Sequence, residues 1–394
     1  MQLNFNELKY LVGTPETIEK MQGLRPLRPF DGRVLSFFDS LSVKLRKNRD
    51  FSDVATFGFW CRKAALLQQK ESYDDISERL GRGIVFHSTP SNVPVNFAFS
   101  LAAGLLAGNA NIVRLPAKDF EQVEIITSAV KELLSSEYTD IAPYICFVKY
   151  ASNSGINDAF SSLCDVRVIW GGDATIARMR RSPLGARAKE ITFADRFSAL
   201  VINADAYLEQ ENKNTVIQGF YNDTYYSDQN ACTSPRIVFW TGRAKEEAKN
   251  DFWQRVHDMA KERYTLAPVQ SVGKLAAMYR AAAEKDISVE KSGDMLVMRL
   301  VPAKLDGALM EYKYNSGFFF EKDIDELEEM IPVCTNRCQT LTYFGIEKQA
   351  LSELIENSHP CGIDRIVPIG RSMDFSLKWD GYDLIREMSR LIEI

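Results

Sequence analysis

Along residues 81–204, short runs of β-branched, aromatic and aliphatic residues alternate with longer stretches whose apolar positions recur at helical spacing. The short runs predict buried strands, and the longer stretches predict helices that bury one face. The strands are expected at residues 83–87, 111–114, 144–148, 166–170, 190–193 and 199–203, and helices at 95–107, 119–135 and 153–163. Such alternation is typical of a mostly parallel sheet with helices on both faces. The sequence therefore predicts an α/β fold.

The same alternation restarts after residue 204 and predicts a second α/β domain at residues 205–375. Its strands are expected at 236–240, 295–300, 317–320, 341–344 and 365–368, and its helices at 209–225, 244–263, 271–283 and 347–356. Residues 1–80 have helical spacing in places and are expected to form a helical segment that packs on the first domain. Residues 376–394 are expected to form a tail that packs on the body of the protein or on a second subunit.

Composition narrows the class of protein without defining it. The chain has 394 residues, of which 45 % are hydrophobic and 26 % charged, with a net charge of −5. These values are ordinary for a globular protein of two or three domains. They give no basic block of the kind that nucleic-acid binders carry. The N-terminal residues do not resemble a signal peptide, and the most apolar stretch, residues 97–107, is too short to span a bilayer.

Seven cysteines are scattered along the chain, and the three histidines are far apart. An odd number of cysteines without paired spacing argues against a disulfide framework or a zinc site. The sequence therefore predicts no metal centre, and a reducing cytoplasm is the expected compartment. The cysteines are Cys61, Cys146, Cys164, Cys232, Cys334, Cys338 and Cys361.

Cys232 is the candidate nucleophile. It lies among small and polar residues directly before the strand expected at 236–240, where a loop can present a thiol. A thiolate is a strong nucleophile even when only a small fraction of the thiol is ionised. The alternative is that Cys232 is one more small buried hydrophobe.

A thiol that attacks a carbonyl generates an oxyanion, which needs hydrogen-bond donors placed in advance. Asn92 lies on a loop after the strand at 83–87 and could supply one donor, with the backbone N–H of Cys232 as a second. The alternative is that Asn92 is a turn residue between two prolines. His87, at the end of the same strand, is expected to be a core histidine.

Three features of the first domain suit a nucleotide cofactor. Gly171 and Gly172 follow a strand and open a helix, where backbone N–H groups can bind phosphates, although a tight turn explains them equally well. Arg114 and Lys118 follow another strand and could lie beside an adenosine ribose, where two cations would favour a 2′-phosphate. The alternative is that both are solvated surface cations.

Taken in order, these residues resemble the aldehyde dehydrogenase superfamily, and more closely the LuxC-type long-chain acyl-CoA reductases. The matching strings are Ser-Asn-Val-Pro-Val-Asn-Phe-Ala from residue 91, Gly-Asn-Ala-Asn-Ile-Val-Arg-Leu-Pro from 108, Asp-Gln-Asn-Ala-Cys-Thr-Ser-Pro from 228 and Asp-Arg-Ile-Val-Pro-Ile-Gly from 364. The resemblance runs from about residue 81 to 385 and is most specific in the last two strings.

The resemblance implies an aldehyde-dehydrogenase-like fold in which residues 81–204 form an NADP-binding, Rossmann-like domain and residues 205–375 the catalytic domain. It implies NADPH-dependent reduction of an acyl-CoA or acyl-protein thioester to the aldehyde. Cys232 would be acylated and Asn92 would bind the oxyanion. Cofactor contacts would come from Ser91, Arg114, Lys118, Gly171 and Gly172. A partner enzyme that transfers an acyl group and a homo-oligomeric state are also expected.

Two departures from the superfamily bear on the reaction. Hydrolytic members carry E-L-G-G before the cysteine, and no glutamate stands at that place here. A base that activated water would waste the acyl-enzyme, so its absence favours reduction; Glu190 is the only nearby candidate for proton delivery. The usual E-x-F-G-P is also missing, and Glu321 is the candidate for ribose binding in its place. The alternatives are an NAD(P)-dependent dehydrogenase that releases acid and an acyl-binding protein without redox activity.

Overall fold

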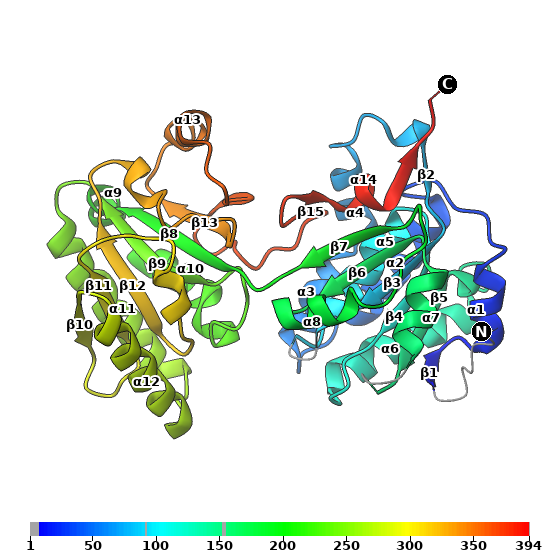
Figure 1. Ribbon diagram of the computed structural model, residues 1–394, viewed down its shortest axis with the longest axis horizontal. Helices are drawn as coiled ribbons and strands as arrows, with labels where there is room; N and C mark the ends of the chain where they lie inside the picture. The colour runs from blue at the N-terminus through cyan, green and yellow to red at the C-terminus, as the bar shows by residue number, and fades with distance from the viewer. Residues whose placement is uncertain (1–7, 91–92, 152–154, 394) are drawn as a thin grey trace. The chain divides into compact units, whose positions relative to one another are not determined.

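The computed structural model describes residues 8–90, 93–151 and 155–393. The chain divides into two compact units (Figure 1). The first consists of Met1–Ala194 with Ser376–Ile394, and the second of Asp195–Phe375. Among the described residues, no helix is both long and apolar enough to cross a membrane.

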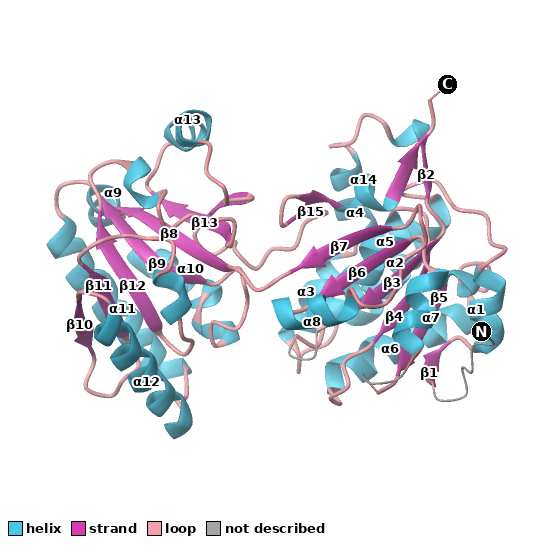
Figure 2. Ribbon diagram, viewed as in Figure 1, coloured by secondary structure: helices cyan, strands magenta, loops and turns pink. Residues whose placement is uncertain are grey.

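The first unit is built on a sheet with the strand order β1-β5-β4-β3-β6-β7 (Figure 2). Strands β3 to β7 run parallel, whereas β1 pairs with β5 in the antiparallel sense. After β3, the strands β4 and β5 add to one side of the sheet, and β6 and β7 then add to the other side of β3. This order is the doubly wound arrangement. The predicted parallel α/β sheet is confirmed. Its strands are β1 (Lys9–Val12), β3 (Ile84–Ser88), β4 (Ala110–Arg114), β5 (Ile145–Lys149), β6 (Val166–Trp170) and β7 (Lys189–Phe193).

Helices accompany each strand of this sheet. They are α1 (Pro15–Met21), α2 (Gly32–Leu45), α3 (Ser52–Trp60), α4 (Lys63–Lys70), α5 (Asn96–Leu106), α6 (Glu121–Ser136), α7 (Ile156–Leu163), α8 (Asp173–Met179) and α14 (Leu384–Met388). The start of α6 differs from the expectation, because Phe120 and not Asp119 is its N-cap. The Asp119 carboxylate instead accepts a hydrogen bond from Lys149, 2.7 Å away.

The C-terminal tail is part of the first unit. Strand β17 (Ser389–Leu391) pairs antiparallel with β2 (Arg79–Gly81), and the short hairpin β15 (Lys378–Trp379) and β16 (Tyr382–Asp383) precedes it. The buried Asn109 donates to the carbonyl of Met388, and Arg82 donates to that of Glu387. The tail thus packs on the body of its own chain.

The second unit contains a seven-stranded sheet with the order β10-β11-β12-β9-β8-β13-β14. Of its strands, β10 alone runs antiparallel to its neighbour. They are β8 (Phe197–Asn203), β9 (Pro235–Thr241), β10 (Ile287–Lys291), β11 (Met298–Pro302), β12 (Phe318–Asp323), β13 (Cys338–Phe344) and β14 (Arg365–Pro368). The boundary expected at residue 204 lies at 194/195, because β8 pairs with β9 and β13 of the second sheet.

Both faces of the second sheet are covered, and each carries its own apolar cluster of buried side chains. The helix expected over 209–225 is shorter at both ends and covers 213–223, and a separate helix over 204–209 precedes it and ends at the extended residue Gln210. The helices are α9 (Ala204–Glu209), α10 (Lys213–Asp223), α11 (Lys245–Arg263), α12 (Pro268–Glu284) and α13 (Lys348–Ser358), with 3₁₀ turns η4 (Tyr225–Ser227), η5 (Leu309–Tyr312) and η6 (Leu327–Met330).

Candidate active site

Cys232 lies in the loop between η4 and β9, at the end of the second sheet where its parallel strands begin. Its side chain is half-buried, and none of the seven cysteines forms a disulfide. Burial raises the pKa of the Cys61, Cys146 and Cys164 thiols to about 12, and Cys334 and Cys338 are also buried. Cys232 and the exposed Cys361 are therefore the two thiols that a reagent or substrate can reach.

The loop turns through two successive left-handed residues, Asp228 at φ 52° and Gln229 at φ 53°. This conformation costs roughly 1 kcal/mol or more per non-glycine residue, so the surroundings must hold it. The Asp228 carboxylate accepts hydrogen bonds from Tyr264, Ser316 and Gln270. The turn that leads into Cys232 is thus fixed by side chains from separate segments.

The buried amide of Gln229 makes a second set of contacts. Its Oε1 accepts from the backbone N–H groups of Gly317 and Phe318, at 2.8 and 3.2 Å. Its Nε2 donates to the carbonyls of Pro235 and Phe318, at 3.2 and 3.3 Å. Gln229 therefore ties the cysteine loop to the first residues of β9 and β12.

Two buried cations complete this support. The Arg236 guanidinium donates to the carbonyls of Gln229 and Tyr314, and Cys232 is among the groups whose negative charge acts on it. The Lys274 ammonium donates to three carbonyls, those of Met295, Ser316 and Gly317. Burial lowers the pKa of Lys274 to about 7. A cation beside a cysteine favours the thiolate, the nucleophilic form.

Ser198 holds the Cys232 peptide itself. It is fully buried at the start of β8, and its hydroxyl donates to the Cys232 carbonyl at 2.8 Å. The same oxygen accepts from the backbone N–H of Thr340 at 3.2 Å. Ser198 thereby links the cysteine loop to β8 and β13.

Replacing Ser198 with Ala should change the reactivity of the Cys232 thiol by about tenfold, because a buried carbonyl and a buried N–H lose their shared partner and the loop relaxes. The measurement is the rate of Cys232 alkylation by iodoacetamide. Ser227→Ala is the matched control, since the Ser227 hydroxyl contacts neighbouring Thr224 and Ser234 and not the Cys232 peptide. Equal rates in the two variants would contradict a positioning role for Ser198.

The segment after β14 adjoins the loop on another side. Thr233 Oγ1 donates to the Met373 sulfur at 3.2 Å, which places Met373 next to the residue after Cys232. The Asp223 carboxylate, at the end of α10, anchors this segment by accepting from the backbone N–H groups of Gly370 and Ser372, at 2.6 and 3.0 Å. Burial raises the pKa of Asp223 to about 6.

A buried carboxyl with a raised pKa predicts a stability that depends on pH. The native state keeps the Asp223 proton up to about pH 6, whereas the unfolded chain loses it near pH 4. The stability that Asp223 contributes to the folded state is therefore full below pH 4 and is lost as pH rises through 6. The free energy of unfolding should fall by about 2 kcal/mol across that window. Urea unfolding at pH 4.5, 5.5 and 6.5 measures it. In Asp223→Asn this fall should disappear, and an unchanged pH dependence would contradict the assignment.

In the first unit, the loops after β3 and β6 flank the point where the strand order reverses. Ligands of doubly wound sheets bind outside the carboxyl ends of the strands at such a point. Ser91 and Asn92, expected in the first of these loops, lie outside the described residues. Gly171 and Gly172 form the second, where Gly172 is exposed and a Cβ added to it would meet nothing within 4 Å.

Arg114 and Lys118 follow the neighbouring strand β4. The half-buried Arg114 guanidinium stacks over the Tyr150 ring at 4.7 Å, and Lys118 is exposed with its ammonium 5.2 Å from the Phe120 ring. Neither contact neutralises the charge, so both cations are available to an anionic ligand.

Glu190, the candidate for proton delivery, is held in β7 by two arginines. It accepts from the buried Arg167 at 2.5 and 3.0 Å and from Arg180 at 2.7 Å. Although burial opposes it, hydrogen bonding to Arg180 and Arg167 lowers the pKa of Glu190 below its ordinary value. A carboxylate held this way carries no proton to donate near neutral pH, which favours a structural role.

Glu321, the candidate for ribose binding, is also engaged within its own unit. Its carboxylate accepts from the indole N–H groups of Trp240 and Trp253 and from Arg299, and its side chain is 3 % exposed. Both oxygens are therefore occupied by buried donors. His87 is a buried core residue as expected, hydrogen-bonded to Ser100 and Asn111, and burial lowers its pKa to about 4.

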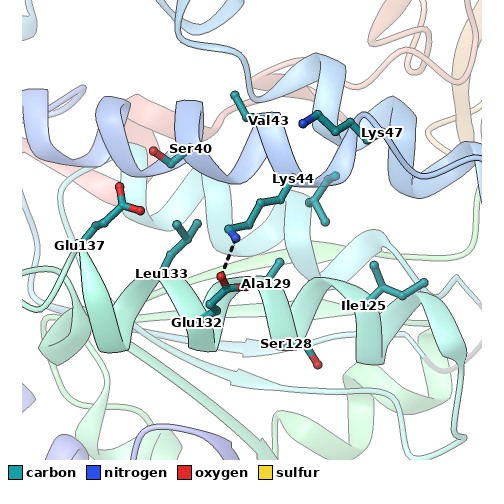
Figure 3. Close-up of a pocket in the computed structure, with 11 residues that line it drawn as sticks. Ser40, Val43, Lys44, Lys47, Ile125, Ser128, Ala129, Glu132, Leu133 and Glu137 are labelled. Atoms are coloured by element: carbon teal, nitrogen blue, oxygen red, sulfur yellow. Dashed lines mark hydrogen bonds and ion pairs between the residues drawn. The ribbon is translucent and has the colours of Figure 1, made fainter.

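A shallow groove of about 630 Å³ lies between α2 and α6 (Figure 3). It contains the Lys44–Glu132 ion pair and none of the predicted site residues. Among the described residues, no group of three His, Cys, Asp or Glu side chains is placed to hold a metal ion.

Two α/β units with largely parallel sheets, the second of which carries the anchored cysteine loop, have the fold of aldehyde dehydrogenases. The fold matches lactaldehyde dehydrogenase from Escherichia coli, with 12 % identity, a TM-score of 0.65, and coverage of 95 % of this chain and 87 % of that one. It also matches an NAD-dependent aldehyde dehydrogenase from Sinorhizobium meliloti, with 11 % identity, a TM-score of 0.66, and coverage of 95 % and 84 %.

Comparison of sequences identifies the family to which the chain belongs. The family described as acyl-CoA reductase (LuxC) matches residues 62–301, and the chain belongs to this family. A long-chain acyl-protein thioester reductase from Vibrio harveyi is 22 % identical over 321 residues, which cover 79 % of this chain. The match spans 63 % of that relative, so the chain covers less than two thirds of its length.

Four residues that support the Cys232 loop were not predicted from the sequence: Ser198, Asp223, Arg236 and Lys274. Ser198 contacts the Cys232 peptide from a distant part of the chain, and Lys274 holds Ser316 and Gly317, which contact the loop through Asp228 and Gln229, so no local pattern could identify either residue. Arg236 could have been predicted, because a charged residue at the start of a β-branched and aromatic strand needs buried hydrogen-bond partners.

Proposed function

We propose that the chain reduces an acyl thioester to an aldehyde through an acyl group carried on Cys232. The observation that carries the proposal is the half-buried thiol on a loop held in a strained conformation by buried donors. Proteins keep such strain where a reactive group must be held in place. Membership of the LuxC family and the acyl-protein thioester substrate named for the Vibrio harveyi relative support the substrate class.

In the first step the Cys232 sulfur attacks the thioester carbonyl. A new thioester forms on the enzyme, and the donor thiol, of CoA or of a carrier protein, leaves with the proton. Ser198 fixes the peptide that follows the sulfur by holding the Cys232 carbonyl. The Cys232 backbone N–H and the Asn92 amide are the proposed donors to the oxyanion.

A nicotinamide nucleotide fits the crevice of the first unit, and when bound it supplies the hydride. The exposed Gly172 turn leaves room for a pyrophosphate to approach the backbone, with Ser91 in the neighbouring loop as a further contact. Arg114 and Lys118, whose charges are not neutralised, favour the 2′-phosphate of NADPH over the free hydroxyl of NADH. Reduction would leave a tetrahedral oxyanion on Cys232, which collapses to aldehyde and the Cys232 thiolate, and a proton from water returns the thiol.

The proposal is tested by incubating the protein with a panel of acyl-CoAs and recording its intact mass. An adduct on Cys232 that disappears when NADPH is added, with loss of NADPH absorbance and formation of aldehyde, is expected. Formation of acid in place of aldehyde would favour the dehydrogenase alternative. An adduct that NADPH never discharges would favour an acyl-binding protein without redox activity.

Arg114→Ala should raise KM for NADPH about tenfold and leave KM for NADH nearly unchanged, because only the 2′-phosphate loses a charge-assisted hydrogen bond. Steady-state kinetics with both nucleotides measure this. Arg180→Ala is the control, because it also removes an arginine of the first unit, but one whose charge is paired with Glu190. A parallel rise for both nucleotides would show that Arg114 supports the fold of the crevice and not the phosphate.

A cytoplasmic location and an acyl-transferring partner enzyme belong to the same proposal. Seven cysteines without a disulfide are consistent with a reducing compartment. An acyl-protein donor would have to deliver its thioester to Cys232, which lies at a loop and not in the core of its unit.

A further inference from the structure

Arg236, at the start of β9, is a buried cation without a carboxylate partner. It is 6 % exposed, and in the described part of the chain no Asp or Glu oxygen forms an ion pair with its guanidinium. Burial lowers the pKa of Arg236 to about 10, so the side chain still carries its charge at neutral pH. Buried charges in proteins are as a rule paired, so another group must provide the balancing anion.

The hydrogen bonds of this guanidinium leave part of it unused. Its Nη1 donates to the Tyr314 carbonyl at 2.5 Å and to Asn315 Oδ1 at 2.7 Å, and its Nη2 donates to the Gln229 carbonyl. All three acceptors are uncharged. A guanidinium has five N–H groups, so two of those of Arg236 donate to no group among the residues that the structure describes. Such donors, beside a full positive charge, can stabilise an anion.

The loop that carries Cys232 closes around this cation. The Gln229 carbonyl is bonded to the guanidinium, and Gln229 Nε2 donates to the Pro235 carbonyl, so the two ends of segment 229–236 are joined. Cys232 lies in the middle of this segment. It is three residues from Gln229, so the two Cα atoms are within roughly 10 Å of each other. The thiol is therefore confined to the neighbourhood of the guanidinium.

Three negative groups act on Arg236, namely Asp195, Asp228 and Cys232. Asp195 is paired with Lys313 and Arg337, at 2.9 and 2.8 Å. The Asp228 carboxylate accepts hydrogen bonds from three uncharged side chains of other segments. Both carboxylates are thus held by other groups, and Cys232 is the third negative group that faces the cation.

We propose that the Arg236 guanidinium is the counter-ion of the Cys232 thiolate. The use of this pair in catalysis rests on the proposed function, in which the sulfur gives its proton to water and attacks the thioester as a thiolate. The same sulfur leaves as a thiolate when the tetrahedral oxyanion collapses to aldehyde. A cation beside the sulfur favours the charged form in both steps.

The other titratable groups around the loop are distinct from this pair. Lys274 is also buried, but the charges that act on it are those of Asp228 and Asp294. Burial raises the pKa of Tyr264, which donates to Asp228 and keeps its proton. Asp223 gains its charge near pH 6. The variants below retain Asp223, Asp228, Asp294 and Tyr264, so these groups affect all of them alike.

Iodoacetamide alkylation of Cys232 between about pH 5 and 10, quantified by peptide mass spectrometry, measures the ionisation of the thiol without any substrate. In Asn315→Asp a carboxylate replaces the amide oxygen that Arg236 already binds, so the guanidinium keeps this contact and gains a second counter-ion. The alkylation midpoint should then rise by about one pH unit. Asn315→Ala removes the contact without adding charge and should leave the midpoint near that of the wild type. An unmoved midpoint in Asn315→Asp would overturn the proposal.

Replacement of the arginine is the second test. The midpoint should rise by about one pH unit or more in Arg236→Gln, and Arg236→Lys, which keeps the charge, should restore most of this shift. Lys274→Met is the matched control, because it removes a second buried cation that supports the same loop. Equal shifts in Lys274→Met and Arg236→Gln would attribute the effect to a disturbed loop and overturn the counter-ion role.

The pH profile of kcat/KM for acyl-CoA connects the pair to the reaction. In Asn315→Asp its acidic limb should move to higher pH by the same amount as the alkylation midpoint. Because alkylation needs no acyl donor, the two proposals can fail separately. A shifted midpoint in a protein that consumes no acyl-CoA would support the counter-ion role and contradict the proposed function, whereas turnover with an unmoved midpoint would contradict the counter-ion role alone.

Discussion

Replacing Cys232 with Ala is expected to abolish aldehyde formation and the acyl adduct together. Both steps require the sulfur, since it displaces the donor thiol and then holds the acyl group for reduction. Removal of a covalent nucleophile typically lowers kcat by more than about 10³-fold, so the residual rate should fall below detection. Intact mass after incubation with acyl-CoA and the rate of NADPH consumption are the two measurements.

Cys361→Ala is the matched control for this variant, because Cys361 is the other accessible thiol of the chain. It should keep both the adduct and the turnover. If the Cys232 variant still formed an adduct while the Cys361 variant did not, the nucleophile would have been assigned to the wrong loop. If both variants turned over, the reaction would not pass through either thiol.

Replacing Glu321 with Ala is expected to destabilise the second unit by about 3 to 5 kcal/mol, the usual cost of breaking a buried ion pair by removing one partner. The change leaves the two indole N–H groups of Trp240 and Trp253 without this acceptor and removes the buried one of the two carboxylates that pair with Arg299. Thermal and urea unfolding, followed by the fluorescence of these buried tryptophans, report the loss.

The control for Glu321 is Glu290→Ala, since Glu290 pairs with the same arginine but is 57 % exposed. Exposed pairs contribute about 0 to 1 kcal/mol, so this variant should unfold almost like the wild type. If Glu321→Ala instead kept its stability and lost affinity for NADPH, its role would be cofactor binding and not support of the fold.

The regular part of the fold could be predicted from local patterns. The runs that became β3, β4, β5 and β6 are mostly apolar and almost entirely buried, which is typical of the strands of a parallel sheet covered on both faces. The edge strands β7 and β14 were expected, whereas the edge strands β1 and β10 were missed, and β10 is exposed along most of its length. The boundary near residue 204 was misplaced because β8 is as apolar as a strand of either sheet, and only pairing decides where it belongs.

For the candidate site, the sequence singled out Cys232 but not the residues that hold its loop. Cys232 stood out because small and polar neighbours precede a strand. Glu190 and Glu321 were chosen by position, and in the structure arginines and tryptophans occupy their oxygens. A carboxylate's partners come from other strands of the sheet, so its availability follows from tertiary packing alone.

The anchoring of Cys232 has a consequence for the order in which the protein is made. Ser198 and Thr340, which meet at the Cys232 peptide, are 142 residues apart, and Asp223 and Ser372 are 149 apart. Contacts this distant in sequence form late and slowly, because the chain loses the entropy of closing a long loop before the contact stabilises it. During synthesis Ser198 and Asp223 emerge before the thiol, but Thr340 and Ser372 emerge long after it, so the nascent chain passes through a stage in which Cys232 is made and its loop is not yet anchored.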